Sequence, residues 1–366
     1  MELSNVNYPL SAIVSRRLNV YKLLLTVLVV YIHANASGAN FASGAVTVSE
    51  PVWLSSFRFF LSNCVARAAV PGFFLTSAVL LYRKPVCWKE NMAKKLRTLG
   101  VPYLILNTLW IAVFFAAQQL PFARDFFSNP DKIIGSWSPV DWLNAYLGFR
   151  GSRYPFLYPL WFVRDLLVLN LLAPLLGRMI DRFPNASFGL AMAAWLLSWN
   201  TGIFCIDAQG ICFWILGGVL VKKEILPECA DRIPLPISTG VYFALLLLTM
   251  AGNWQIIRQL MILTGVVFWF QVTVLIRSSR IMDALGKLSA FSFGIYLFHE
   301  FFLTFARKVA VKLLPLTPVS QFLQYLLIPL AVVLLCIAIC GVLKKPCGVC
   351  PWHMPCRKED GPGFAA

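Results

Sequence analysis

The chain has 366 residues, of which 59% are hydrophobic and only 13% are charged, and its mean hydropathy is +0.72. Because soluble domains carry about 25% charged residues, this balance excludes an ordinary soluble enzyme and indicates a membrane protein with many spans. The net charge of +16 would suit a nucleic-acid-binding protein, but the positions of the basic residues argue against that class. The first apolar segment is followed by further apolar segments, so we expect no cleavable signal peptide.

Ten apolar segments are candidates for membrane crossings. They are residues 20–38, 56–81, 99–118, 157–177, 186–200, 210–221, 236–252, 259–276, 288–305 and 323–343. With the N-terminus inside, twenty basic residues fall in the inner segments and eight in the outer loops. This bias satisfies the positive-inside rule. The sequence therefore predicts an all-α, polytopic membrane protein with about ten transmembrane helices and both termini in the cytoplasm.

The first segment carries two ionisable residues, Lys22 and His33, eleven positions apart. Eleven helical steps of about 100° place both side chains on one face, about 16 Å apart along the axis. Ionisable groups inside a membrane are costly and usually functional. The pair suits a ligand with an anionic head and a long reactive arm, which is the shape of a coenzyme A thioester. A snorkelling lysine and a histidine satisfied by a neighbouring helix is the structural alternative, given equal weight.

The second segment carries Arg67 near its middle, where an unpaired guanidinium is costly. We expect this side chain to face the interior of the helix bundle or a wet cavity. Pro71 and Gly72 follow, and they predict a local break in the helix.

A strongly basic loop follows the second segment and contains Lys94, Lys95 and Arg97. Most of its charges suit a solvated loop beside anionic lipid. The alternative is that these three residues bind the phosphates of an anionic cytosolic cofactor.

The fourth and ninth segments carry further polar groups. Arg164 and Asp165 are adjacent, hence about 100° apart on a helix, so we expect each to have its partner on another helix. Asp165 would then neutralise Arg67 or Arg58. His299 and Glu300 lie in the outer half of the ninth segment.

The ten cysteines do not form a secreted framework. Cys205 and Cys212 would pair if their loop faced an oxidising space. The tail holds zinc-type ligands, Cys347, Cys350, His353 and Cys356. A reduced cytoplasmic tail without metal is the favoured interpretation.

These features occur together in one family. The chain resembles the acyltransferase 3 superfamily of bacterial integral-membrane acyltransferases, in the short form without a periplasmic hydrolase-like domain. The likeness covers roughly residues 15–345. Its motifs are Lys22 with His33, an R-x3-P-x-FF-x-x-S run from Arg67 to Ser77, the basic loop ending in Pro102 and Tyr103, Leu160–Phe162, Leu216–Gly218 and Gly294–His299. Ala78 departs from the family, which usually has glycine there.

The resemblance implies transfer of an acyl group, most often acetyl, from cytosolic acyl-CoA to a hydroxyl of a cell-surface glycan or lipid-linked saccharide. It implies a multi-pass protein of the bacterial cytoplasmic (inner) membrane, with an acyltransferase 3-like domain over residues 1–345. Residues 346–366 form a cytoplasmic Cys/His-containing tail, which is not a family feature. The expected partners are acyl-CoA, the saccharide acceptor and membrane lipids, with no nucleic acid and no metal.

Site roles follow from the resemblance and the residues together. Catalysis is assigned to His33 and Arg67, donor binding to Lys22, Lys94, Lys95 and Arg97, and substrate contact or orientation to Ser77, Arg164, Asp165 and His299. His33 has two open roles: a general base for the acceptor hydroxyl, or a carrier of the acyl group. Arg67 would steady oxyanion charge or orient His33.

Two other functions compete with acyl transfer as interpretations of this sequence. A secondary transporter, or an exporter of a lipid-linked saccharide, would use the intramembrane charges as a substrate path. Transporters often carry paired broken helices in their two halves, and the Pro71–Gly72 break has no counterpart in the second half. A non-catalytic scaffold would not need basic residues within spans.

Overall fold

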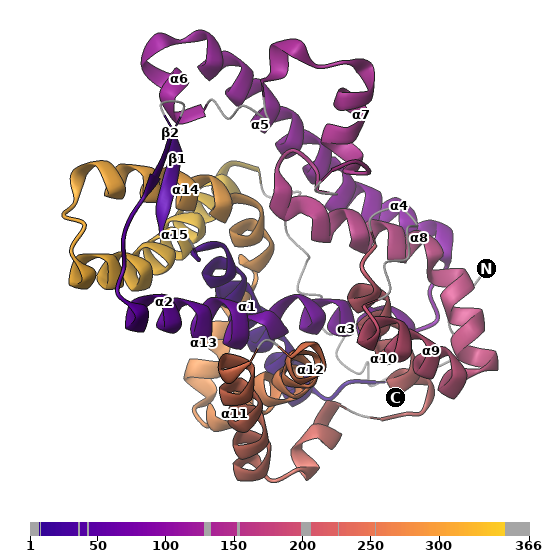
Figure 1. Ribbon diagram of the computed structural model, residues 1–366. Helices are drawn as coiled ribbons and strands as arrows, with labels where there is room; N and C mark the ends of the chain where they lie inside the picture. The colour runs from indigo at the N-terminus through magenta and orange to yellow at the C-terminus, as the bar shows by residue number, and fades with distance from the viewer. Residues whose placement is uncertain are drawn as a thin grey trace.

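The computed structural model describes residues 7–347, except residues 8, 36, 42–43, 128–132, 152–153, 199–205, 226 and 253. It is built from helices, with short 3-10 or π turns (η) and one hairpin (Figure 1). In chain order the elements are α1 (Ala12–His33), β1 (Gly38–Phe41), β2 (Gly44–Thr47), α2 (Val52–Arg58), η1 (Phe59–Cys64), η2 (Val65–Ala68), α3 (Ala69–Tyr82), α4 (Trp88–Lys95), η3 (Leu96–Gly100), α5 (Val101–Gln119), α6 (Pro121–Phe127), η5 (Ile134–Ser136), α7 (Pro139–Leu147), η6 (Tyr158–Leu160), α8 (Trp161–Arg182), α9 (Pro184–Leu196), α10 (Ala208–Lys222), η7 (Pro227–Arg232), α11 (Leu235–Ala251), α12 (Gln255–Val272), η8 (Thr273–Leu275), α13 (Ser279–Ser289), α14 (Ser292–Leu313) and α15 (Pro318–Cys347).

Several of these helices are long and apolar enough to cross a membrane. Five segments within the described residues meet that test: Val52–Tyr82, Trp88–Gln119, Tyr158–Arg182, Gln255–Leu275 and Pro318–Leu343. A sixth is added if α13 and α14, bent by 61° at their junction, form one span. The chain is therefore a helical, multi-pass membrane protein. The ten spans and the cytoplasmic termini stay predictions.

The helix α1 lies in the middle of the bundle and packs against α3, α12, α13, α14 and α15 (Figure 1). Ser11 caps its first turn by accepting a hydrogen bond from the Val14 N–H at 3.2 Å. The helix therefore begins at Ala12, eight residues before the predicted segment. Tyr21 and Leu25 on its flank are fully buried. Since other helices surround α1, Lys22 and His33 face protein on several sides.

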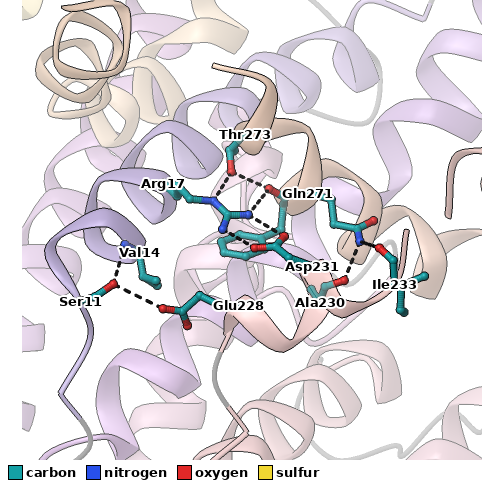
Figure 2. Close-up of polar contacts among 10 residues, drawn as sticks. Ser11, Val14, Arg17, Glu228, Ala230, Asp231, Ile233, Gln271 and Thr273 are labelled. Atoms are coloured by element: carbon teal, nitrogen blue, oxygen red, sulfur yellow. Dashed lines mark hydrogen bonds and ion pairs between the residues drawn. The ribbon is translucent and has the colours of Figure 1, made fainter. Parts of the chain in front are cut away.

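An ion pair anchors the first turns of α1 to η7, and further contacts of the same side chain reach η8 and the end of α12. Figure 2 shows the Arg17 guanidinium bound by both carboxylate oxygens of Asp231, at 2.5 and 3.0 Å. Its Nε–H donates to the Thr273 hydroxyl at 2.9 Å, and the guanidinium lies 4.4 Å from the centroid of the Phe270 ring. Arg17 is only 5% exposed. These contacts fix the rotation and depth of α1, and hence the positions of Lys22 and His33.

The segment from Val52 to Tyr82 is continuous but irregular. A π turn (Phe59–Cys64) and a 3-10 turn (Val65–Ala68) separate α2 from α3. Pro71 lacks an N–H, and its ring clashes with the carbonyl four residues earlier, that of Arg67. The predicted break is therefore present, but it lies one turn before Pro71. Arg67 is in the broken turn itself.

The hairpin and the cysteines are the remaining features to compare with the sequence predictions. The hairpin pairs Gly38 with Thr47 and was not predicted; β1 lies against α14 and α6. Cys212 is buried and carries a free thiol, whereas Cys205 lies outside the described residues. Of the tail ligands, Cys350, His353 and Cys356 lie outside the described residues, and Cys347 is the last residue of α15.

Candidate active site

Three elements distant in sequence meet at the last residue of α1, His33. Its Nδ1 lies 2.5 Å from the hydroxyl of Tyr158 on η6. The Tyr158 hydroxyl donates to Oε2 of Glu300 on α14 at 3.1 Å. The same carboxylate oxygen is 3.9 Å from His33 Nδ1, and both side chains are 12% exposed. Tyr158 therefore connects His33 to Glu300.

The donors and acceptors of this chain fix the proton on the imidazole. A carboxylate only accepts, so Tyr158 gives its single proton to Glu300. The tyrosine oxygen must then accept from His33, which places the ring proton on Nδ1. The other nitrogen, Nε2, keeps its lone pair. This arrangement leaves His33 ready to take a proton from a substrate hydroxyl, as a general base does.

A second histidine lies beside the first. The ring centroids of His33 and His299 are 5.1 Å apart, and His299 is fully buried. Its Nδ1 lies 2.7 Å from the Tyr296 carbonyl oxygen and 3.2 Å from that of Ile295, so the ring proton is on Nδ1. Its Nε2 is buried and has no hydrogen-bond partner in the described part of the chain.

His33, His299 and Glu300 could together hold a metal ion. Each offers one ligand atom, and these atoms all lie within 4.8 Å of one another. Two imidazoles and a carboxylate suit a divalent transition metal. The expectation that no metal is needed stays a prediction.

Arg67 hydrogen-bonds to Asn63, whereas Asp165 pairs with Arg164. The Arg67 Nη2 donates to Asn63 Oδ1 at 2.8 Å, and its side chain is exposed. The charges of Arg67 and Arg307 both act on the imidazole of His33. Pairing of Arg67 with Asp165 is therefore not observed, and a role for Arg67 beside His33 stays a prediction.

Arg164 and Asp165 pair with each other, so the expectation of separate partners on other helices is wrong for the carboxylate. Their closest side-chain atoms, Nη2 and Oδ1, are 2.9 Å apart, and both residues are buried. An arginine side chain is long enough to reach a carboxylate on the adjacent residue despite the roughly 100° step between the two positions. Arg164 also donates to the Leu147 carbonyl at the end of α7, at 2.8 Å. The remaining predicted acid partner, Arg58, pairs instead with Glu50.

The residues predicted to bind the donor lie in the middle of α1, on α4 and on η3. Lys22 is half-buried on α1, and the charges of Lys22 and Lys94 both act on Lys95. The charges of these three lysines therefore influence one another, and their joint binding of a donor stays a prediction. Arg97 follows on η3 with an exposed side chain, and its grouping with them stays a prediction.

Ser77 lies on α3, half-buried, next to the position where the chain departs from the family pattern. Ala78 is fully buried against Gly217 of α10, because a Cβ built on Gly217 would lie 2.8 Å from that of Ala78. Glycine therefore occurs on the facing helix, and the two helices stay in close contact despite the alanine. The role of Ser77 in substrate contact stays a prediction.

Sequence reasoning missed Tyr158, Arg307 and the role of Glu300. Glu300 had a usable signal, since a carboxylate within an apolar segment beside His299 needs a reason to be there. Tyr158 had none, because a tyrosine near the end of an apolar segment is ordinary.

Comparison with known proteins gives the same assignment over most of the chain. A family model described as an acyltransferase domain (acyltransferase 3) matches residues 16–343. The succinoglycan biosynthesis protein ExoH of Rhizobium meliloti (strain 1021) is 26% identical over 307 residues, which cover 79% of this chain and 79% of that protein. No solved structure matches the chain. The match over residues 16–343 shows that the chain belongs to the acyltransferase 3 family.

Proposed function

We propose that this protein transfers an acyl group, most often acetyl, from cytosolic acyl-CoA to a hydroxyl of a cell-surface or lipid-linked saccharide, in the bacterial cytoplasmic membrane. The observation that carries the proposal is the Glu300–Tyr158–His33 hydrogen-bond chain, which leaves a lone pair on His33 Nε2. Membership of an acyltransferase family supports the reaction class. A saccharide acceptor is supported by the likeness to ExoH, a succinoglycan biosynthesis protein.

The proposed step balances on the residues present. His33 Nε2 takes the proton of the acceptor hydroxyl while the oxygen attacks the thioester carbonyl. The C–S bond then breaks, and the imidazolium returns the proton to the leaving thiolate. Charge that develops on the carbonyl oxygen faces the guanidinium of Arg67, whose field reaches His33. Glu300, through Tyr158, steadies the imidazolium while it exists.

The donor is proposed to bind along α1. Phosphates of acyl-CoA would meet Lys22 with Lys94 and Lys95, whose charges already act on one another. Lys22 and His33 are about three helical turns apart on one face of α1, which an extended pantetheine arm can span. The thioester would then reach His33.

The first experiment compares surface glycans by mass spectrometry from cells with and without the protein. Added acyl mass that depends on the protein is expected, and it should disappear with His33→Ala at unchanged protein level and detergent melting temperature. Near-normal acylation by a well-expressed His33→Ala variant would remove His33 from the chemistry. Unacylated glycan together with a smaller surface amount would instead indicate an exporter.

The second experiment tests the donor end. Lys22→Ala should raise the KM for acetyl-CoA by roughly 10- to 150-fold, because one charged hydrogen-bond partner of a phosphate is lost. Lys22→Arg should keep most of the affinity, and Lys89→Ala, on the exposed side of α4, is the matched control. A fall in kcat at saturating donor with an unchanged KM would place Lys22 in the chemistry and contradict its role as a phosphate ligand.

A further inference from the structure

A pocket that is partly open to the outside lies beyond the candidate active site. It is formed by the loop after α1, α2, α14 and α15. Ala34, which follows His33 directly, lines it, as do Leu303 and Arg307 on α14. Leu303 and Arg307 are about one and two turns beyond Glu300 on the same helix. The pocket therefore lies next to His33, the proposed general base.

The walls of this pocket contain polar groups of both signs. Arg58, only 9% exposed, pairs with Glu50. The Nε of Arg58, the Nε of Arg307 and the second carboxylate oxygen of Glu50 are all buried, and none has a hydrogen-bond partner among the described residues. Two donors and one acceptor thus lie unmatched in the residues around one pocket. Unmatched buried polar groups are costly, so this is a place where a ligand would be stabilised.

The combination of groups selects the ligand. A sugar hydroxyl both donates and accepts, so neighbouring hydroxyls on one ring can serve Arg58, Arg307 and Glu50 together. A phosphate or carboxylate only accepts, so it would serve the two arginines but leave the Glu50 oxygen unmatched. Apolar lining from Leu303, Val311 and Pro329 suits the C–H face of a sugar ring.

We infer that this pocket binds a neutral, polyhydroxylated sugar ring of the acceptor and brings one of its hydroxyls toward His33. The inference rests on the proposed function, because it identifies the pocket as the acceptor half of that site. Arg307 belongs to both halves: it lines the pocket, and its charge acts on His33 and on Tyr158. A bound ring would thus lie beside the groups that handle its proton.

The test measures binding directly, on the full-length protein in lipid nanodiscs, so that it does not depend on turnover. Cellobiose is the neutral probe and glucuronic acid the anionic one, each followed by saturation-transfer NMR and titration. We expect cellobiose to bind and glucuronic acid to bind at least about tenfold more weakly, because its carboxylate replaces the C6 hydroxyl, which can donate to Glu50, with a group that only accepts.

Two variants keep the positive charge and remove the guanidinium donors. Arg58→Lys and Arg307→Lys should each weaken cellobiose binding by about tenfold or more, as expected for the loss of a charged hydrogen bond. Arg280→Lys, exposed on α13, is the matched control and should change nothing. Melting temperatures exclude unfolding, and Arg307→Lys serves if Arg58→Lys fails to fold.

The outcomes separate this inference from the proposed function. Binding of glucuronic acid but not cellobiose, or cellobiose binding unchanged in both variants, would overturn the pocket assignment while leaving acyl transfer intact. Cellobiose binding that both variants weaken, in a protein that transfers no acyl group, would support the sugar pocket and contradict the transfer reaction.

Discussion

Tyr158 joins His33 and Glu300, the two groups that we propose act together in the reaction. Its hydroxyl accepts from one and donates to the other. His33 and Glu300 do not hydrogen-bond to each other directly, because the 3.9 Å between Nδ1 and Oε2 is too long for a hydrogen bond. Loss of the Tyr158 hydroxyl should therefore change the rate of the reaction and not the binding of the donor.

Tyr158→Phe removes that hydroxyl and leaves the ring. We expect kcat to fall by about 10- to 100-fold, a part of the 10²- to 10⁴-fold typical of general acid–base catalysis, because His33 loses the acceptor that fixes its proton on Nδ1. The KM for acetyl-CoA should not change. Tyr154→Phe is the control, since its ring lies 6.3 Å from that of Tyr158 and is exposed. Unchanged kcat in Tyr158→Phe would show that the chain of hydrogen bonds has no part in turnover.

Arg67 and Arg164 are the matched pair for separating catalysis from folding. Arg67 is exposed and bonded to Asn63, so Arg67→Ala should melt at nearly the wild-type temperature and lose kcat. Arg164→Ala leaves Asp165 charged and buried, which costs about 3–5 kcal/mol, so folded protein should be lost. Melting curves in detergent and initial rates measure both. Equal losses of stability in the two variants would contradict a catalytic Arg67.

At the scale of elements, α1 depends on its anchor at Arg17. Arg17→Ala removes this ion pair, whose Asp231 carboxylate is 31% exposed, together with the hydrogen bond to Thr273, and should destabilise the fold by about 1–3 kcal/mol. The neighbouring Arg16, whose side chain is 55% exposed and 3.5 Å from Asp283, is the control, and Arg16→Ala should cost about 0–1 kcal/mol. Unfolding by SDS titration measures the difference. Similar costs for both would show that the Arg17 ion pair does not hold α1 in place.

The close packing of helices α3 and α10 depends on the absence of a side chain at Gly217. A Cβ there would lie 2.7 Å from the Leu75 carbonyl oxygen and 2.8 Å from the Ala78 Cβ, both on α3. Gly217→Ala should therefore destabilise by about 1–3 kcal/mol through overpacking, and adding Ala78→Gly should restore part of it. Gly240→Ala, in α11 with nothing within 4 Å of the new Cβ, should be neutral or stabilising. A neutral Gly217→Ala would mean that the two helices can separate freely.

For the whole molecule, the charge bias predicts both termini on the cytoplasmic side. A C-terminal alkaline phosphatase fusion should be inactive, and a C-terminal green fluorescent protein fusion should fluoresce, because these reporters work on opposite sides of the membrane. Matched fusions after Gly151, in a predicted outer loop, should give the reverse pattern. Phosphatase activity at the C-terminus would require an odd number of spans.

The sequence by itself determined the membrane class, the order of the apolar segments, the placement of Lys22 and His33 on one face of α1 and the presence, though not the exact position, of a break in the helix near Pro71. These features depend on local composition and on helical periodicity, which short stretches of sequence encode directly. The family followed from motifs in their order along the chain.

The tertiary structure alone decided which side chains complete the site. Tyr158 lies 125 residues from His33 and 142 from Glu300, so their contact depends on how α1, η6 and α14 pack. Hydropathy does not say which apolar helices pack together; that packing depends on small residues such as Gly217 and on partly buried ion pairs such as Arg17–Asp231. The same packing leaves Asp165 paired with Arg164 and leaves buried atoms of Arg58 and Glu50 without partners among the described residues around one pocket. These pairings depend on which side chains the packed helices bring within reach of each polar group.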